Sequence, residues 1–420
     1  MSGEVDLSAA SGLVRKRYDK KLKDLRSVAA VIQNRIEFDS AEKLGDTYQV
    51  GVMVRPPNGV TYNGSAGGAA TLNTQQNSVS KQAAVSGYEL NLVERITLKA
   101  LASAVEKGEQ AIGNLLDEVI AGLKKSAMNR VEASALCGQY GYGTVESVTD
   151  LTGNVAEIVI TAATWRPGVF WFFGESSRWD SFTTTTKNNG SGDLVLTKIN
   201  ARQRTITVTF TGTLASEVTA GDVLFPKGAN AGSSTFNECP GLIAQARNLT
   251  ATSMGIDANT YNNWKGNQFI VSGEFSLGVA EEFFADLRDR GAVGKLSLYL
   301  NNRAYSRLAT EVMAARMMDQ SYSPEKAKLG QRAIAYQTAD LDEVEIVKHP
   351  FLAWGEGLIL PDEDCGRYGS SDVTLGIPGM KEDLFVLVPG TNTVEVQVYS
   401  DQGPLLKRPN FSGHITGITY

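Results

Sequence analysis

Hydrophobic residues follow a helical spacing near the start of this chain and an alternating spacing soon afterwards. Residues 13–38 carry charged side chains on one helical face and apolar side chains on the other, at Leu22, Leu25, Val28, Val31, Ile32 and Ile36. The valines of the segment 50–54 then alternate along the chain, until the proline pair at residues 56–57 ends any sheet ladder. The spacing therefore predicts a helix over residues 13–38 and then a strand that runs out to a tip.

The stretch 63–82 is a run of small, uncharged polar residues with one lysine, Lys81. Such a run cannot bury enough apolar surface to offset the entropy of ordering it. With the strand before it and the returning segment after it, residues 45–88 are expected to form one long, two-stranded arm. An arm of this kind can be ordered by lying across a neighbouring chain, so the pattern indicates a protein that assembles.

A second helix is predicted over residues 89–130. Its apolar stripe has residues spaced four apart, with cations near its C-terminal end, where the helix dipole favours them; these residues are Ile112, Leu115, Leu116, Val119, Ile120 and Leu123, then Lys124, Lys125 and Arg130. Glycine in a helix interior costs about 1 kcal/mol relative to alanine, and we expect a bend near Gly108.

Residues 143–228 are rich in threonine and valine and predict a β-domain. Alternation in the segments 193–199 and 204–210, on either side of the turn 200–203, predicts a hairpin. Aromatic residues crowd into the segment 165–179, either as a ligand-binding surface or, as we favour, as the core plug of a small barrel. Such an inserted domain would carry its own core, and its excision should be tolerated by the rest of the chain.

The C-terminal part mixes helices and strands in the order typical of α/β or α+β sheets. Amphipathic helices are predicted at 279–291 and 303–318 around a buried strand at 295–301. Short strands are expected at 342–349, 357–360, 383–389 and 393–400.

The composition describes a folded protein and excludes several classes. The formal net charge of −6 argues against a dedicated nucleic-acid binder, although the segment 13–26 is strongly basic. Three cysteines lie far apart in the sequence, which favours reduced thiols over a disulfide framework or a zinc site. The sequence shows neither a secretion signal nor a segment that approaches a membrane span, so we expect a protein made in the cytosol.

The sequence offers little for catalysis. His349 and His414 are the two histidines, and neither has a neighbouring nucleophile in a known motif. We expect His349 to cap a strand before Pro350 and His414 to lie on the C-terminal strand. The segment 291–297 lacks the spacing of a phosphate-binding loop. We therefore expect no catalytic residue and no cofactor.

Two further groups of side chains have alternative interpretations. The acidic residues Asp362, Glu363, Asp364 and Asp372 suit a solvated loop better than a cation site, because they lack the alternating ligands of a calcium loop. We therefore expect no metal site. Lys81 is either a partner in a covalent isopeptide link between subunits or a solubilising charge.

The order of these segments resembles the Hong Kong 97-type major capsid proteins of tailed bacteriophages. Residues 298–312 look like the strand and helix of its axial domain, although Asn301 and Asn302 stand where the family often has Asn-Pro. The segment 351–364 resembles a later axial-domain strand. The fold class implied is α+β. The division implied is an N-terminal arm (1–44), an extended E-loop (45–88), a peripheral domain with a spine helix (89–142), an inserted β-domain (143–228), a mainly axial domain (229–380) and a return to the peripheral domain (381–420).

The resemblance also implies a function and partners. The chain would self-assemble into hexamers and pentamers of an icosahedral head enclosing double-stranded DNA without sequence specificity. Scaffolding, portal and decoration proteins would be partners, no membrane would be involved, and assembly would occur in the host bacterial cytoplasm. Inter-subunit contacts are expected from the E-loop, at Val54, Arg55, Pro56, Tyr62, Leu72 and Lys81, and the N-terminal arm would present a basic face at Arg15, Lys16, Arg17, Lys20 and Lys21.

Two alternatives remain open. An encapsulin-like protein shell shares the fold, although the inserted β-domain and the chain length disfavour it. From a different class, the chain could be a hydrolytic or carbohydrate-binding protein whose aromatic β-module holds substrate. The sequence lacks a well-spaced acid/base set for that second alternative, although paired carboxylates can be distant in sequence.

Overall fold

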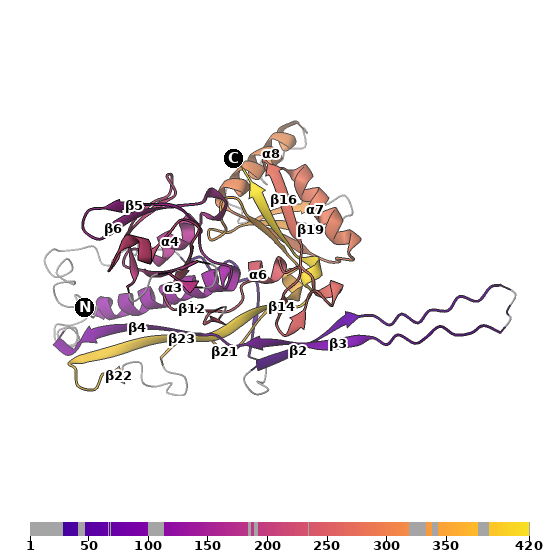
Figure 1. The fold of residues 1–420 in the computed structure, drawn as a ribbon, viewed down its shortest axis with the longest axis horizontal. Coiled ribbons are helices and arrows are strands. Elements are labelled where there is room, and N and C mark those ends of the chain that lie inside the picture. Colours follow the sequence, from indigo (N-terminus) through magenta and orange to yellow (C-terminus); the bar gives the residue numbers. More distant parts are fainter. Residues whose placement is uncertain are drawn as a thin grey trace.

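The computed structural model describes most of the chain in a body with one long projection (Figure 1). The described residues are 28–40, 47–65, 67, 69–99, 113–183, 186–188, 192–233, 235–318, 333–337, 343–376 and 386–419. The predicted bend near Gly108 and the basic residues of the segment 13–26 lie outside them. Among the described residues, no helix is both long enough and apolar enough to cross a membrane.

A long sheet runs under the body. Strand β23 (Thr393–Leu406) lies at its centre and pairs antiparallel with β4 (Glu89–Thr97), β21 (Cys365–Leu375) and β22 (Val386–Leu387), while β1 (Phe38–Asp39) adds a parallel pair to β21. Helix α3 (Gly113–Cys137) covers this sheet, and Leu123 and Ala127 pack against Ile96, Val396 and Val398. The long sheet and α3 together form one hydrophobic layer.

The predicted helix over residues 89–130 is therefore wrong at its start. Residues 89–97 also have alternating apolar positions, and the central strand of the long sheet supplies backbone partners along all of β4. Tertiary pairing thus overrides the helical spacing. Residues 98–99 are helical as predicted, and α3 begins at Gly113 and ends at Cys137, beyond the predicted end.

A second sheet curls into a barrel. Its strands run in the order β11-β7-β9-β10-β6-β5, with β8 paired to β7. The bridge between Thr144 and Val223 joins its two edges. The hairpin predicted over residues 193–210 is confirmed as β9 and β10. The strand bounds are β5 (Val145–Leu151), β6 (Val155–Ile160), β7 (Arg178–Thr183), β8 (Thr186–Lys187), β9 (Leu194–Asn200), β10 (Thr205–Thr209) and β11 (Val223–Pro226).

The aromatic segment fills this barrel and the space beside it. Trp165 and Trp179 are fully buried, as the core-plug interpretation predicts, whereas Trp171 on α4 (Pro167–Phe173) is 56% exposed. The expectation of a separate core is wrong, however. The buried cluster that contains Trp165 continues without a break through Leu136 on α3 and Phe351 into the rest of the body.

A mixed sheet forms the other side of the body, in the order β16-β24-β20-β17-β19-β18. The predicted strand at 295–301 and the helices around it are confirmed as β17, α7 and α8. Figure 1 shows both helices against this sheet. The bounds are β16 (Gln268–Gly273), β17 (Leu296–Leu300), β18 (Ala333–Gln337), β19 (Glu343–Lys348), β20 (Gly357–Leu360), β24 (Gly413–Ile418), α7 (Leu277–Asp289) and α8 (Asn302–Met318).

The two sheets divide the C-terminal residues differently from the predicted split at residue 380. Strand β24 lies between β16 and β20 in the mixed sheet. Residues 381–420 were expected to form part of the peripheral domain, together with residues 89–142. Conversely, β21 lies within the range expected to be mainly axial but belongs to the long sheet. The chain therefore crosses between the sheets more than once after residue 360.

Shorter elements connect these layers. They are η1 (Ala162–Thr164), α5 (Leu214–Glu217), β12 (Asn230–Gly232), β13 (Thr235–Phe236), α6 (Leu242–Ala246), β14 (Thr252–Ser253), β15 (Ile256–Asp257), η2 (Asn262–Trp264), η4 (Asp362–Asp364) and η5 (Pro409–Phe411).

Candidate assembly surface

The projection in Figure 1 is a hairpin of β2 (Thr47–Arg55) and β3 (Val79–Ser86), which we call the arm together with its tip, residues 56–78. The strands pair antiparallel, with Tyr48 opposite Val85 and Val52 opposite Lys81. The predicted two-stranded arm is thus confirmed in its pairing.

The root of the arm is fastened to the body. Tyr48, Val54 and Val85 are buried in a cluster with Trp264 and Leu405. The backbone N–H of Ala84 also donates to the carbonyl of Met254 at 2.9 Å. These contacts fix the direction in which the arm leaves the body.

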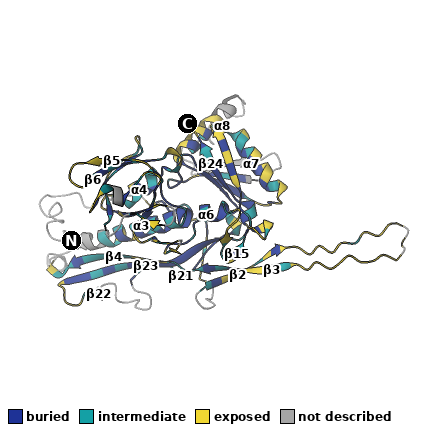
Figure 2. Cartoon of the chain, in the orientation of Figure 1, coloured by how far each residue is buried: buried dark blue, intermediate teal, exposed yellow. Residues whose placement is uncertain are grey.

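The tip is almost entirely exposed (Figure 2). Tyr62 is 94% exposed and Leu72 is 81% exposed. The two sides of the tip are linked where the N–H of Asn58 donates to the carbonyl of Gln76 at 3.0 Å, and Asn73 donates from its side chain to the carbonyl of Val60 at 2.7 Å. These apolar side chains gain nothing from burial within their own chain, so they are available for contact with another molecule.

The predicted contact residues fall into two groups. Arg55, Pro56, Tyr62, Leu72 and Lys81 are exposed along the arm. Val54 is 4% exposed and packs within its own chain, so its side chain is unavailable to a neighbour. Met53 and Val60 were not predicted, yet they are exposed apolar side chains on the same arm; Met53 could have been found from its outward register beside the inward valines.

Residues 28–39, which we call the strap, lie against α3 and carry the described part of the predicted first helix. That prediction is wrong for these residues, which form a turn and then β1. Side chains of α3 accept hydrogen bonds from backbone N–H groups of the strap. Asn129 Oδ1 accepts from Ala29 at 2.9 Å, and Glu132 accepts from Ile32 at 2.6 Å and from Gln33 at 3.1 Å. The buried Ile32 and Ile36 enter the main core.

An ionic cluster fixes the end of the strap to the mixed sheet. Arg35 pairs with Glu345 at 2.7 Å and with Asp362 at 3.0 Å. The hydrogen bond from Arg35 lowers the pKa of Glu345 to about 2. Ser297 and Tyr299 donate to Asp362 at 2.6 and 2.8 Å.

Three of the acidic residues noted in the sequence, Asp362, Asp364 and Asp372, each pair with a different arginine of the same chain. The solvated-loop interpretation is wrong for Asp362, while Asp364 pairs with Arg408 at 2.6 Å and Asp372 with Arg367 at 3.2 Å. Within the described ranges, no cluster of His, Cys, Asp and Glu has the arrangement of a metal site.

Both histidines are buried. His349 follows β19 directly, and its Nδ1 accepts from the N–H of Phe351 at 3.1 Å, so its Nε2 carries the proton that is donated to Glu132 at 3.0 Å. His414 lies on β24, edge-on to Tyr140. Their positions agree with the expected strand ends and strands, and both serve internal contacts.

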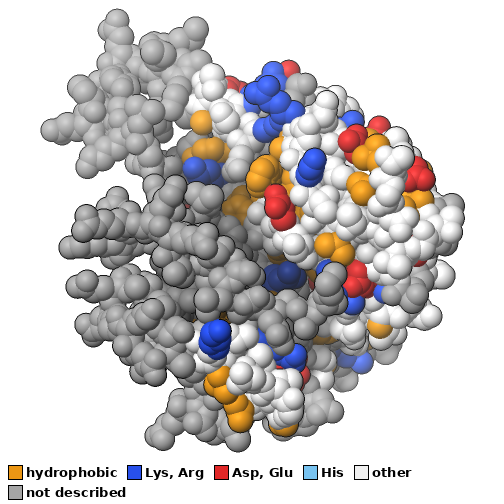
Figure 3. Space-filling model, turned by 90° about the vertical axis from the view of Figure 1, so that its left-hand side faces the viewer, with side chains coloured by type: hydrophobic (Ala, Val, Ile, Leu, Met, Phe, Trp, Pro, Cys, Tyr) orange, Lys and Arg blue, Asp and Glu red, His pale blue; other side chains and the backbone are white. Residues whose placement is uncertain are grey.

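Charge is mixed over the described part of the face seen in Figure 3, where acidic, basic and hydrophobic side chains are interspersed. The predicted basic face, at Arg15, Lys16, Arg17, Lys20 and Lys21, lies outside the described residues. The arm is thus the most prominent exposed feature of the described chain.

The sequence matches no protein-family model and no curated protein sequence. Among solved structures, the capsid of cyanophage A-1(L) superposes with a TM-score of 0.55 at 11% identity, covering 99% of this chain and 100% of that one. The capsid of Myoviridae phage XM1 (TM-score 0.48, 7% identity, 99% and 100% covered) and that of a native GTA particle (0.47, 9%, 100% and 100%) are more distant. The cyanophage match, which spans the whole length of both chains, is the one on which the fold assignment rests, and it shows that this chain has the α+β, Hong Kong 97-type fold.

Proposed function

We propose that this chain is a major capsid protein, a virion component that self-assembles into hexamers and pentamers of an icosahedral head enclosing double-stranded DNA. The observation that carries the proposal is the exposed tip of the arm on a chain with a capsid fold. The cyanophage protein, which shares that fold, forms a capsid.

The physical support comes from the tip itself. The described residues of the tip form neither helix nor strand, and their hydrogen bonds run mainly across the tip. Ordering so many residues costs conformational entropy that such few contacts do not offset. Burial of Tyr62 and Leu72 against an adjacent copy, with backbone pairing by the tip, would supply the missing stabilisation. Arg55, Pro56 and Lys81 would lie in the same contact.

The finer features of the resemblance belong to this proposal. The β5–β11 barrel would be the inserted domain, α3 the spine helix, and the long and mixed sheets the peripheral and axial domains. Scaffolding, portal and decoration proteins would be transient or accessory partners in the host bacterial cytoplasm. The mixed charge on the described part of the face in Figure 3 and the net charge of −6 suit a container that encloses DNA without binding its bases.

Two alternatives differ in what they would contain or bind. An encapsulin-like shell would also be closed but would enclose protein. A carbohydrate-binding or hydrolytic role would need the aromatic cluster as a surface, yet Trp165 and Trp179 are buried in the core. Trp171 remains exposed, and one ring is a weak basis for a sugar platform.

Electron microscopy of the purified full chain tests the proposal. We expect closed shells, or rings of five and six subunits. Nuclease-protected DNA in particles recovered from infected cells would support the phage head, whereas protein cargo in particles free of nucleic acid would favour the encapsulin-like shell. A stable monomer at all concentrations, binding an oligosaccharide, would overturn the proposal.

A further inference from the structure

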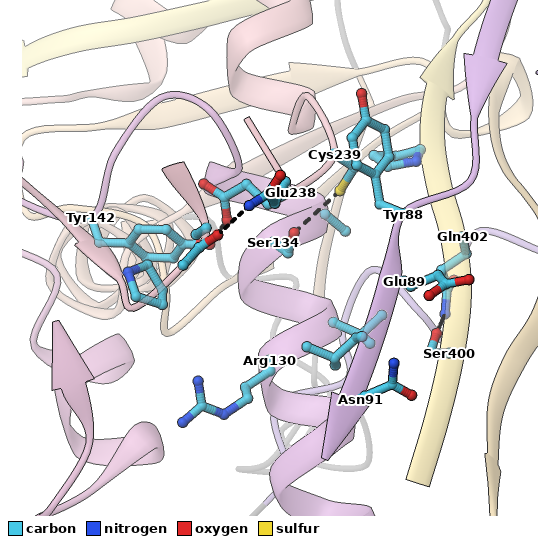
Figure 4. Close-up of a pocket in the computed structure, with 18 of the residues that line it drawn as sticks. Tyr88, Glu89, Asn91, Arg130, Ser134, Tyr142, Glu238, Cys239, Ser400 and Gln402 are labelled. Atoms are coloured by element: carbon cyan, nitrogen blue, oxygen red, sulfur yellow. Dashed lines mark hydrogen bonds between the residues drawn. The ribbon is translucent and has the colours of Figure 1, made fainter. Parts of the chain in front are cut away.

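A cavity of about 260 Å³ lies where the first residues of β4 meet α3, the barrel and β23 (Figure 4). Most of its lining is apolar, with Val131, Ala135, Phe173 and Pro226 among the walls. This volume is below the range of about 300–1,000 Å³ typical of sites for drug-sized molecules, so any ligand it takes is small.

Arg130 is the unusual member of this lining. Its guanidinium stacks on the ring of Phe173 at 4.6 Å, and within the described residues it forms no ion pair with a carboxylate. Burial accordingly lowers the pKa of Arg130, with the Tyr142 hydroxyl as the opposing influence. A half-buried cation stacked on an aromatic ring leaves its planar N–H edge for a carboxylate, which a guanidinium can bind through two parallel hydrogen bonds.

Three charged residues that line the cavity with Arg130 already have partners of their own. Glu89 accepts from the hydroxyl of Tyr399 at 3.3 Å, and Lys227 pairs with Asp193 at 2.8 Å. Glu238 accepts from the N–H of Gln139 and from Tyr142, and burial raises its pKa to about 7. At a pH of about 6 Glu238 is mainly protonated and does not repel an anion.

From this geometry we propose that the cavity is a binding site for a small carboxylate with an apolar body, held by the guanidinium of Arg130, with its body against the apolar walls at Val131, Ala135 and Pro226. The site is independent of shell formation, because α3, β4, β23 and the barrel all come from one chain. It therefore stands or falls separately from the function proposed above.

Titration of the full-length protein with sodium benzoate at about pH 6, followed by ligand-observed NMR, tests the proposal. Benzamide, with nearly the same shape and no charge, is the matched probe. We expect benzoate to bind with millimolar or tighter affinity, and benzamide to bind at least about tenfold more weakly, because it cannot pair with the guanidinium. Equal binding of both probes, or no benzoate binding at about 10 mM, would overturn the proposal.

Variants locate the site. R130Q should weaken benzoate binding at least about tenfold, whereas R307Q, which removes an exposed cation of α8 outside the cavity, should leave it unchanged. Wild-type affinity in R130Q would exclude this cavity. If R130Q does not fold, R130K keeps the charge without the planar edge and should bind benzoate measurably more weakly than wild type, and unchanged affinity there would count equally against the proposal.

Discussion

Glu132 is a fully buried carboxylate on α3, and it holds three different segments together. Its oxygens accept from the backbone of Ile32 and Gln33 in the strap and from the imidazole of His349 after β19. A carboxylate buried without partners would be very unfavourable, whereas three donors compensate for the lost water. Glu132 thus fixes the backbone of the strap by accepting from its N–H groups, as the side chain of a helix N-cap does for the first turn of a helix.

Replacing Glu132 with glutamine should lower the free energy of unfolding by about 3 kcal/mol, because the amide group places its own donors against groups that also donate. Chemical denaturation of disassembled subunits measures the change. E395Q is the matched control, since Glu395 forms a partly exposed pair with Arg95 and should contribute no more than about 1 kcal/mol. Equal effects of the two substitutions would mean that the strap adds little stability.

Glu238 predicts a pH dependence of stability. Its pKa is raised by burial from an ordinary 4.5 to about 7, so the folded state holds its proton more tightly than the unfolded state. Stability from this group is fully present below about pH 4.5 and is lost as the pH rises to about 7. The E238Q variant does not titrate, so its unfolding free energy should gain up to about 3 kcal/mol relative to wild type across that range.

Denaturation series at several pH values check this expectation. The neighbours Tyr142 and Cys239 have their pKa values raised by burial, that of Cys239 to about 12, so neither titrates in this range. E146Q, which alters an exposed carboxylate paired with Arg204, should keep the wild-type profile. Parallel profiles for wild type and E238Q would contradict the assignment.

Some residue-scale features follow from sequence and others do not. Asn301 sits at the N-cap of α8, where its Oδ1 accepts from Arg303 at 2.8 Å and Ala304 at 3.1 Å, and Asn302 takes the first helical position, which proline also favours. That local chemistry is readable in advance. The roles of Asn129 and Glu132 are not, because their partners lie about a hundred residues away along the chain.

At the scale of elements, the arm divides into a root that its own chain stabilises and a tip that it does not. Ala83 and Val85 of β3 are buried, so a cut that reached residue 83 would damage the body as well. Asn58 and Gln76, joined by a backbone hydrogen bond, mark a place where the tip can be removed cleanly.

Replacement of residues 59–75 by an Asn-Gly turn should leave the subunit folded and prevent closed shells. The turn suits a two-residue hairpin, and the removed residues contribute little to the core, so the unfolding free energy should change by less than about 0.5 kcal/mol. Circular dichroism and electron microscopy provide the two readouts. Leu151→Ser, at an exposed apolar position on the barrel, is the control and should still assemble; normal shells from the shortened arm would refute its role in assembly.

Strand β4 illustrates why element prediction failed where it did. Leu90, Val93 and Ile96 fit a helical stripe, while Leu90, Leu92 and Ile96 also fit the alternation of a strand. Only β23, three hundred residues later in the chain, decides between the two by pairing with all of β4. The arm, by contrast, was predictable because its valines alternate and its tip consists mainly of small polar residues.

At the scale of the whole molecule, the barrel and the mixed sheet share one core. Arg166 before α4 pairs with Glu356 at 2.6 Å, and both are buried. The N–H of Trp354 donates to the carbonyl of Trp165 at 3.1 Å, and a side chain at Gly168 would collide with the carbonyl of Pro350. The barrel is therefore held to the segment 350–356 by buried contacts of the kind found in a protein core.

Excision of residues 144–228 with a short linker should abolish cooperative unfolding. The deletion would expose Leu136, Phe351 and their neighbours and would leave Glu356 buried without its arginine. Denaturation and proteolysis of the variant measure this, and the arm-tip variant is the control for a deletion outside the core. A cooperative transition in the excised protein would show that the barrel is separable.

The order of segments was enough to predict the fold class but not its internal division. Alternation and helical spacing identify elements, and the polar excursion identifies the arm. The crossing of β21 and β24 between sheets depends on long-range pairing, which sequence periodicity does not encode. For the same reason, the continuous core around Trp165 could not be distinguished from a separate one.

The arm and the long sheet lie along one line in Figure 1, and only Gly87 and Tyr88 separate β3 from β4. A pull on the tip therefore passes straight into β4, parallel to its axis. Antiparallel hydrogen bonds run across the strands, so the pairing of all nine residues of β4 with β23 resists such a pull together rather than one bond after another. Tension between neighbouring subunits would be carried by a strand that is paired along its whole length.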